Sequence, residues 1–203
     1  MKLVLSDHGH LNHTETVMAK PAQKLATYED LFDLPENLTG EIINGRLITQ
    51  PRPAPRHARA HSSLGVRIGG PFDLGDGGPG GWWILDEPEL HIAGDILVPD
   101  LAGWRREQMP RLPDTAWFET VPDWVCEILS PSTASDDRVE KMPLYARMGV
   151  KHVWLVDPAL RTLEAYENRQ GQWLLLQTLA DDAQVALAPF DAVEWALGVL
   201  WAD

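Results

Sequence analysis

The chain has 203 residues, of which 44% are hydrophobic and 23% are charged, and these fractions are typical of globular proteins and exclude wholesale disorder. A chain of this length buries about 70% of its unfolded surface, so one domain is expected, and no apolar run approaches the ~18 residues of a transmembrane helix. Thirty acidic residues against 17 basic ones give a net charge of −13, which argues against a general nucleic-acid coat protein.

The N-terminal residues carry no pattern of a secretory signal. The first ten residues contain one lysine and only four apolar residues, too few for the apolar core of a signal peptide. The single cysteine, Cys126, excludes an intramolecular disulfide, so we expect a cytoplasmic protein. Residues 1–24 are polar and predict a flexible tail, which leaves a single domain over residues 25–203.

The first predicted elements are a short helix and a β-hairpin. A capping-box-like pattern predicts the helix over residues 28–34. The dipeptide Asn44-Gly45 separates two β-prone runs, 40–43 and 46–49, and such a dipeptide is the strongest short signal for a hairpin.

A longer helix and a glycine-rich segment come next. Ala60, Leu64 and Ile68 recur at four-residue spacing, which predicts a helix from Pro55 to about Ile68. Residues 69–81 contain seven glycines and predict a flexible loop, which lacks the lysine of a phosphate-binding loop.

Short strands dominate the rest of the chain. Strands are predicted at 82–85, 89–92, 96–104 and 124–129, with an irregular exposed loop at 105–122. Asp136 or Asp137 is predicted to cap a helix that runs to Met148, with Val139 on its apolar side and Pro143 interrupting it. The remaining elements are a strand at 153–156, a hairpin of 163–166 with 173–176, strands at 185–187 and 193–195, and a helical end at 197–201. These elements predict an α/β (α+β) fold with extra β-hairpins.

Three acidic residues lie in or beside apolar strands. Glu41 and Glu127 are each inside a β-prone run, and Asp100 follows another such run directly. A carboxylate in such a place costs several kcal/mol unless it is paired, protonated or bound to a metal. For any single one of them, exposure on an edge strand would be an ordinary explanation. Three of them in one chain favour a shared site.

The chemistry of such a site would be metal-assisted hydrolysis of a phosphodiester. Converging carboxylates hold Mg²⁺ or Mn²⁺ through oxygen ligands, and the ion polarises a phosphoryl oxygen and lowers the pKa of a bound water. A nearby lysine would orient or deprotonate that water and offset charge in the transition state. Lysine is scarce in this chain, and Lys141 ends a long interval without one.

One stretch is basic although the whole chain is acidic. Between Ile42 and Phe72 there is no acidic residue, and the stretch contains Arg46, Arg52, Arg56, Arg59 and Arg67 together with His57 and His61. This stretch is a candidate for contacts with DNA phosphates through Arg52, Arg56, His57 and Arg59. The alternative is that its arginines pair with the acidic segment after Asp157.

The ordered motifs resemble those of the Uma family of restriction endonucleases, within the PD-(D/E)XK nuclease superfamily. The resemblance covers about residues 24–201, and its most specific part runs from Glu127 to Pro158. The matching runs are Glu41-Ile42-Ile43-Asn44-Gly45-Arg46-Leu47, Val98-Pro99-Asp100-Leu101, Glu127-Ile128-Leu129-Ser130-Pro131-Ser132-Thr133, Asp137 with Lys141, Tyr145-Ala146, Gly149-Val150 and Trp154-Leu155-Val156-Asp157-Pro158. The resemblance implies a restriction-endonuclease-like core, in which a mixed central sheet carries flanking helices.

The same resemblance implies the roles of individual residues. Leu129 occupies the usual lysine position, and Lys141 would supply the lysine from the following helix. Asp100, Glu127, Glu41 and the carbonyl of Ile128 would be the Mg²⁺ or Mn²⁺ ligands. His57 matches a histidine of the family that faces phosphate or only packs, and Asp137 fits a helix N-cap better than a catalytic role.

The leading hypothesis is therefore a Mg²⁺-dependent DNA endonuclease that uses Glu41, Asp100, Glu127 and Lys141. A non-catalytic nucleic-acid-binding or assembly protein on the same fold is the alternative, and a β-rich module that binds small molecules is a third. Because a nuclease of the restriction type cuts two strands of a two-fold symmetric duplex, we also expect a homodimer. No membrane partner is expected.

Overall fold

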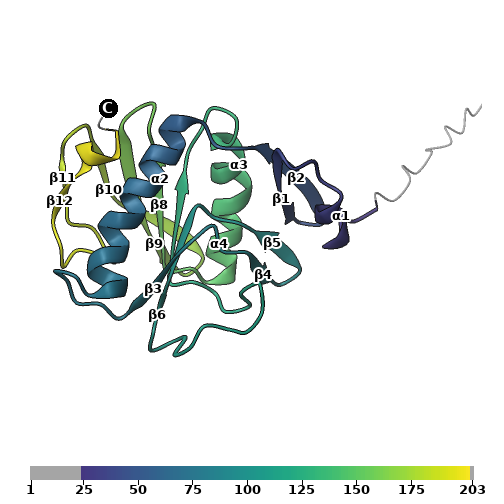
Figure 1. The fold of residues 1–203 in the computed structure, drawn as a ribbon, viewed down its shortest axis with the longest axis horizontal. Coiled ribbons are helices and arrows are strands. Elements are labelled where there is room, and N and C mark those ends of the chain that lie inside the picture. Colours follow the sequence, from purple (N-terminus) through teal and green to yellow (C-terminus); the bar gives the residue numbers. More distant parts are fainter. Residues whose placement is uncertain (1–23, 202–203) are drawn as a thin grey trace, which may run out of the picture.

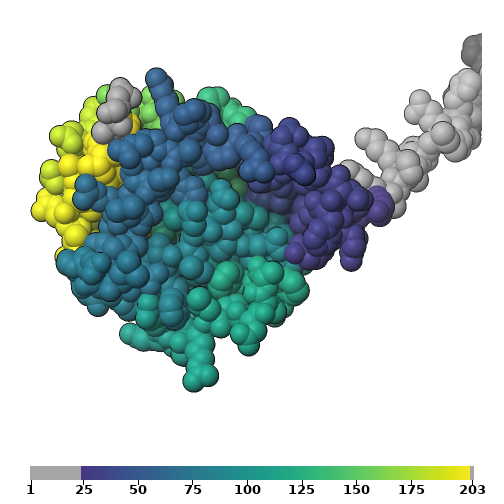
Figure 2. Space-filling view, in the orientation of Figure 1, coloured from purple at the N-terminus to yellow at the C-terminus, as the bar shows by residue number. Residues whose placement is uncertain are grey.

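The computed structural model describes residues 24–201, in which strands form a small sheet and a larger central sheet. All of the predicted tail except Lys24 lies outside the described residues. Figure 1 shows β1 and β2 at one side of the molecule and β11 and β12 at the opposite side. The space-filling view shows the purple residues of this N-terminal hairpin and the yellow residues of the C-terminal elements on opposite sides of a continuous body (Figure 2).

The small sheet begins with the predicted hairpin. Strands β1 (Leu38–Ile43) and β2 (Arg46–Pro51) pair antiparallel, after a helical turn, α1 (Glu29–Phe32). Asn44 and Gly45 have φ angles of 51° and 72°, the left-handed pair that a tight hairpin turn requires. Strand β1 also pairs with β5 (Asp95–Leu97), and β5 pairs with β4 (Leu90–Ile92). This arrangement places β1, and therefore Glu41, beside the segment that follows β5.

The predicted strand over residues 96–104 is wrong, because the structure divides it between the two sheets. Its first part is β5, and its second part is β6 (Leu101–Arg105) in the central sheet. Pro99 lies between them, and proline has no N–H with which to continue a ladder. The short crossing segment brings Asp100 to the boundary between the two sheets.

The central sheet is mixed, as predicted, with the strand order β10-β9-β8-β7-β6-β3. Its strands are β3 (Trp82–Asp86), β6, β7 (Trp124–Ile128), β8 (His152–Asp157), β9 (Thr162–Arg169) and β10 (Gln172–Ala180). Strands β7 and β8 are parallel, and every other neighbouring pair is antiparallel. A parallel pair needs a crossover connection, and the helical segment between β7 and β8 provides it.

Helices cover both faces of the central sheet (Figure 1). The helix α2 (Pro55–Ile68) matches its predicted bounds and packs one face through Ala60, Leu64 and Ile68. The helix α4 (Met142–Met148) packs the other face. Along β7, Cys126 and Ile128 join the core under α2, whereas Val125 and Leu129 join the core under α4. Because side chains alternate along a strand, Glu127 shares the face that α4 covers.

The crossover contains a wide helical turn that the sequence did not indicate. It consists of α3 (Ala134–Asp136), then a π-helical turn at Asp137–Lys141, then α4. Gly149 caps the C-terminus of α4 with a φ of 94°. Neither Asp136 nor Asp137 is the N-cap, because the segment begins after Thr133, so this prediction is wrong. Pro143 does not interrupt the helix, because it lies in the first turn of α4. The wide turn also leaves Val139 67% exposed.

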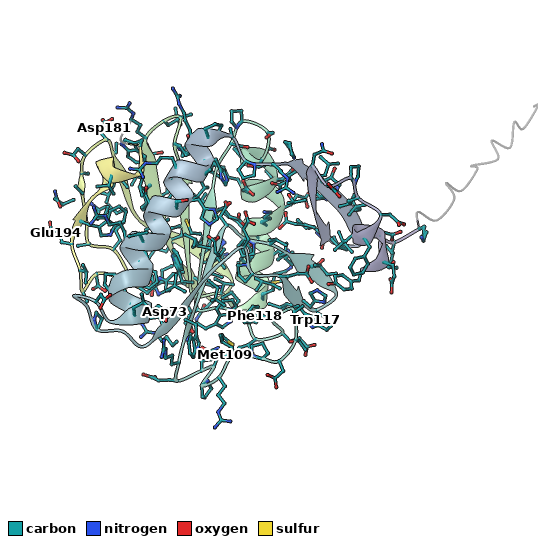
Figure 3. The ribbon with its side chains drawn as sticks, viewed as in Figure 1. Asp73, Met109, Trp117, Phe118, Asp181 and Glu194 are labelled. Carbon is teal, nitrogen blue, oxygen red and sulfur yellow. The ribbon has the colours of Figure 1, made fainter. Side chains whose placement is uncertain are left out.

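The glycine-rich segment is more ordered than the predicted flexible loop. A π-helical turn at Gly69–Leu74 continues α2, and Phe72 in it is buried. Asp73 in the same turn accepts a hydrogen bond from the backbone of Ile84 at 3.1 Å and pairs with Arg106 at 2.7 Å (Figure 3). These contacts fix the segment against β3 and the end of β6.

The connection after β6 is irregular, as predicted, but parts of it are buried. Met109 is 6% exposed, and Phe118 stacks on Trp104 with their ring centres 4.7 Å apart (Figure 3). The C-terminal elements are β11 (Gln184–Val185), β12 (Trp195–Ala196) and a 3₁₀ turn at Leu197–Leu200. None of the helices within residues 24–201 has the length and apolar character needed to cross a membrane.

Candidate functional site

A pocket of about 300 Å³ opens where the small sheet meets the end of β7 and the π-helical turn. We call it the acidic pocket. The four residues predicted to be catalytic all line it, although they are spread over a hundred positions of sequence: Glu41, Asp100, Glu127 and Lys141. Asp137 and the segment from Ser130 to Thr133 complete the side formed by the helical crossover.

Lys141 is the centre of the charged groups in this pocket. Its Nζ lies 2.9 Å from Glu41 Oε2, 3.3 Å from Asp137 Oδ1 and 3.4 Å from Glu127 Oε1. The lysine side chain is only 3% exposed. Burial opposes its charge, but the three carboxylates outweigh burial and raise the pKa of Lys141 well above its usual range. The three carboxylates therefore favour the ammonium form of Lys141.

Glu41 is held by one donor from β2 and one from the segment that follows β5. Its Oε1 accepts a hydrogen bond from the backbone N–H of Val98 at 2.8 Å, and its Oε2 accepts one from Gln50 Nε2 at 3.1 Å. The residue is 3% exposed. Both carboxylate oxygens are thus engaged by protein groups, which fix the orientation of Glu41 in the pocket.

Glu127 is fixed by a residue to which sequence reasoning gave no role. Tyr145 Oη donates a hydrogen bond of 2.6 Å to Glu127 Oε1, and both side chains are buried. Burial raises the pKa of Glu127 well above its usual range; Lys141 opposes this shift, and the neighbouring carboxylates reinforce it. The position of Tyr145 four residues after Lys141 is the signal that could have identified it, because such residues share a helix face.

Asp100 lies at the start of β6 and joins the helix α2 to the end of β7. Its Oδ2 accepts a hydrogen bond from the backbone N–H of Ile128 at 2.6 Å, and its Oδ1 lies 3.1 Å from His57 Nε2. Burial lowers the pKa of His57, but Asp100 and the carbonyl of Ile128 outweigh it and the net shift is upward. The Ile128 carbonyl therefore lies on the same side as His57 and Asp100.

Asp137 belongs to the pocket, and its predicted N-cap role is wrong. It lies in the π-helical turn, one turn before Lys141, and is 2% exposed. Burial raises the pKa of its carboxyl group, while Lys141 and Thr133 lower it by smaller amounts. The four-residue spacing of Asp137 and Lys141 is the signal that could have paired them, because residues four apart are neighbours on a helix.

The acidic pocket gathers four carboxyl groups, those of Glu41, Asp100, Glu127 and Asp137, around two basic groups, Lys141 and His57. Burial and the neighbouring carboxyl groups raise the pKa of Glu127 and of Asp137, and a bound cation would lower both. A hard divalent cation such as Mg²⁺ binds carboxylate and carbonyl oxygens. Asp100, Glu127 and Ile128 line one pocket, and their carboxylate and carbonyl oxygens are donors of the kind that such an ion takes.

The predicted phosphate-binding residues are only partly brought to this pocket. Arg52 and His57 line it, whereas Arg56 and Arg59 are exposed on α2 outside it. Arg52 donates to the Glu36 carbonyl oxygen at 2.8 and 3.2 Å, and Arg46 pairs with Glu140 at 2.8 Å. Neither partner belongs to the acidic segment after Asp157, which was the alternative for this stretch.

The pattern of the chain and its fold are both matched by known proteins. A family model, Uma2, described as "Putative restriction endonuclease", matches residues 25–199. A crystal structure from Anabaena variabilis, described as "a putative nuclease belonging to DUF820", superposes with a TM-score of 0.68 at 22% sequence identity. The superposition covers 85% of this chain and 96% of that chain, and at this identity it shows a shared fold. No curated protein matches the sequence.

Proposed function

The chain belongs to the Uma2 family of restriction endonucleases, and from this membership we propose that it is a divalent-metal-dependent endonuclease acting on DNA. One observation carries the proposal. A buried ammonium, Lys141, contacts carboxylates from the small sheet, from β7 and from the π-helical turn in one pocket. Three elements that are distant in sequence meet there, and their charged side chains are buried although burial of charge costs free energy. Such an arrangement is expected of an active site.

In this proposal Asp100, Glu127 and the carbonyl of Ile128 would hold Mg²⁺ or Mn²⁺. When bound, the ion would polarise a phosphoryl oxygen and lower the pKa of a water. Water adds to phosphorus, the bond from phosphorus to the leaving sugar oxygen breaks, and that oxygen receives the proton that the water gives up, so the products are a phosphate monoester and an alcohol. The chain's own residues orient the groups around the reacting phosphate.

Lys141 supplies positive charge to the phosphoryl oxygens as negative charge develops on them. Glu41 on β1 and Asp137 in the π-helical turn hold the ammonium group of Lys141 in place. Tyr145 holds Glu127 through one carboxylate oxygen, Oε1, and leaves Oε2 for the metal ion. The raised pKa of Lys141 supports a role as an electrostatic stabiliser, and it argues against the deprotonation of water that the sequence left open.

The test is DNA cleavage with and without a divalent metal. Supercoiled and linear DNA are incubated with Mg²⁺, Mn²⁺ or EDTA, using wild type, Lys141→Ala, Asp100→Asn and the exposed-lysine control Lys24→Ala. Wild type and the control are expected to cleave only with metal, and the two pocket variants are expected to lose cleavage while their circular dichroism is unchanged. DNA binding without cleavage under all metals would instead support the non-catalytic alternative.

A further inference from the structure

A second group of possible metal ligands lies on the α2 side of Asp100. His57 and His61 are four residues apart on α2. They lie on the same face of the helix as the buried residues Leu64 and Ile68, one and two turns closer to its N-terminus. Ligand atoms of His57, His61 and Asp100 all lie within 4.8 Å of one another. Two imidazoles one helical turn apart on the same face are a common way for a helix to present a metal ion with two ligands.

His61 is the buried histidine of this group. It is 7% exposed, and its Nε2 contacts Asp86 Oδ1 without the alignment of a hydrogen bond. His57 Nε2 lies 3.1 Å from Asp100 Oδ1. Each imidazole therefore turns a nitrogen toward a carboxylate oxygen, as donor atoms do around a shared metal ion.

Asp86 is a fourth possible ligand, because the pairing of β3 with β6 brings it close to Asp100. It ends β3, where it lies opposite Leu101 in the pairing of β3 with β6, and therefore next to Asp100. Its Oδ1 contacts His61 Nε2, and its side chain is 76% exposed and so has room to turn. The donor set then consists of two imidazole nitrogens and two carboxylate oxygens.

We propose that His57, His61, Asp100 and Asp86 form a binding site for a first-row transition-metal dication of the zinc type. Imidazole ligands select Zn²⁺, Co²⁺ or Ni²⁺ over Mg²⁺, which takes oxygen ligands and keeps its waters. Ligand atoms around a tetrahedral Zn²⁺ lie ~3.4 Å apart, so the present spacing closes by rotation of side chains. The site does not depend on the nuclease function, since neither its ligand chemistry nor its readout involves cleavage.

The proposed Mg²⁺ site has only oxygen ligands, whereas the proposed transition-metal site has two imidazole nitrogens as well. Ile128 N–H donates to Asp100 Oδ2, and His57 contacts Asp100 Oδ1, so the two oxygens of this carboxylate face different partners. Asp100 can therefore belong to both sites, with the nitrogen ligands on the α2 side and Glu127 on the α4 side. A transition metal is then bound whether or not Glu127 is intact.

The experiment is a titration of the full chain with Co²⁺, followed by visible absorption and by competition with Zn²⁺. His8, His10 and His13 can also bind these ions, so every protein carries glutamine at these three positions. This parent protein is compared with His61→Asn, with Glu127→Gln and with the control His91→Asn. His91 is a half-buried histidine that bonds Glu89 at 2.6 Å and lies outside both sites.

The parent, Glu127→Gln and His91→Asn are expected to bind one Co²⁺ with the same spectrum. His61→Asn is expected to bind at least ~10-fold more weakly, because changes around a metal typically cost 10–100-fold in affinity. Equal affinity in His61→Asn, or loss in Glu127→Gln alone, would overturn the proposal. Displacement of Co²⁺ by millimolar Mg²⁺ would overturn it as well.

A second variant keeps the proposal testable if His61→Asn fails to fold. His61→Cys retains a ligand, and Co²⁺ bound to its thiolate would add a charge-transfer band in the near ultraviolet that the parent lacks. Cys126 does not contribute such a band, because it is fully buried and burial raises the pKa of its thiol. A folded His61→Cys protein that binds Co²⁺ without this band contradicts the assignment.

Discussion

Lys141 Nζ lies 2.9 Å from Glu41 Oε2, and this ion pair joins the helical crossover of the central sheet to the small sheet. Both side chains are less than 5% exposed. The pair therefore has a structural effect as well as the proposed catalytic one. Breaking a buried ion pair leaves an uncompensated charge in a medium that solvates it poorly.

We expect Lys141→Ala to lower the free energy of unfolding by about 3–5 kcal/mol, the usual cost of removing one partner of a buried ion pair. Unfolding in urea, in EDTA, measures the change. The control is Lys24→Ala, whose pair with Asp30 is exposed and should contribute little to stability because solvent screens it. Similar losses in the two variants would mean that the pocket does not hold a charged lysine.

Tyr145→Phe removes only the hydrogen bond to Glu127. The expected cost in unfolding free energy is about 1.5–3 kcal/mol, because the bond is buried and its acceptor is a carboxylate. Single-turnover cleavage should slow as well, since Glu127 loses the group that orients it. Tyr166→Phe removes a comparable tyrosine–glutamate bond, to Glu164, outside the pocket, and should leave cleavage unchanged.

The stability of the protein should depend on pH through His152. Burial lowers the pKa of His152, and its Nδ1 has no hydrogen-bond partner within the described part of the chain. Between this lowered pKa and about 6.5, the unfolded state binds a proton that the folded state does not, so stability falls as pH falls through that window. His57 has a raised pKa and contributes with the opposite sign.

The comparison that isolates His152 is wild type against His152→Gln. Urea unfolding from pH 7.5 to 5 should show a larger loss of stability in wild type, by at most ~1.4 kcal/mol per pH unit for one proton. Parallel pH profiles for the two proteins would contradict the shift.

The basic stretch should determine how DNA affinity depends on salt. Three arginines on phosphates would give a slope of log K against log salt of about −3 on duplex DNA. Arg52/Arg56/Arg59→Ala should reduce this slope toward zero, measured with Ca²⁺ as a non-cleaving ion. The exposed control triple Arg111/Arg147/Arg161→Ala should keep the slope, and the same slope in both triples would place the DNA elsewhere.

A homodimer is the expected form in solution, since two strands require two sites related by a two-fold axis. Sedimentation equilibrium at micromolar concentration should give a species of twice 22.7 kDa. A species of 22.7 kDa alone, with or without DNA, would contradict this expectation.

Much of the pocket could be predicted because buried charge is conspicuous in an apolar strand. Glu41 and Glu127 were visible for this reason, and the structure brings both to Lys141. Periodicity likewise indicated α2, and Asn44-Gly45 indicated the first hairpin. These signals depend only on residues that are close in sequence, so they can be interpreted without knowing how the elements pack together.

The features that were missed depend on contacts between distant residues or on backbone geometry. The split of one predicted strand at Pro99 depends on pairing of β5 with β1, which local sequence does not encode. The partnership of Tyr145 with Glu127 depends on which face of α4 meets β7. The contact of His61 with Asp86 is visible only after the surrounding side chains are in place.

In the π-helical turn at Asp137–Lys141 each backbone hydrogen bond spans five residues, one more than in an α-helix. Such turns correspond to the insertion of a single residue into a regular helix, so the orientation of Asp137 relative to α4 is set by chain length as well as by residue identity. Deleting the exposed Val139 would restore regular winding and rotate Asp137 by about 100° relative to α4, with every pocket side chain unaltered.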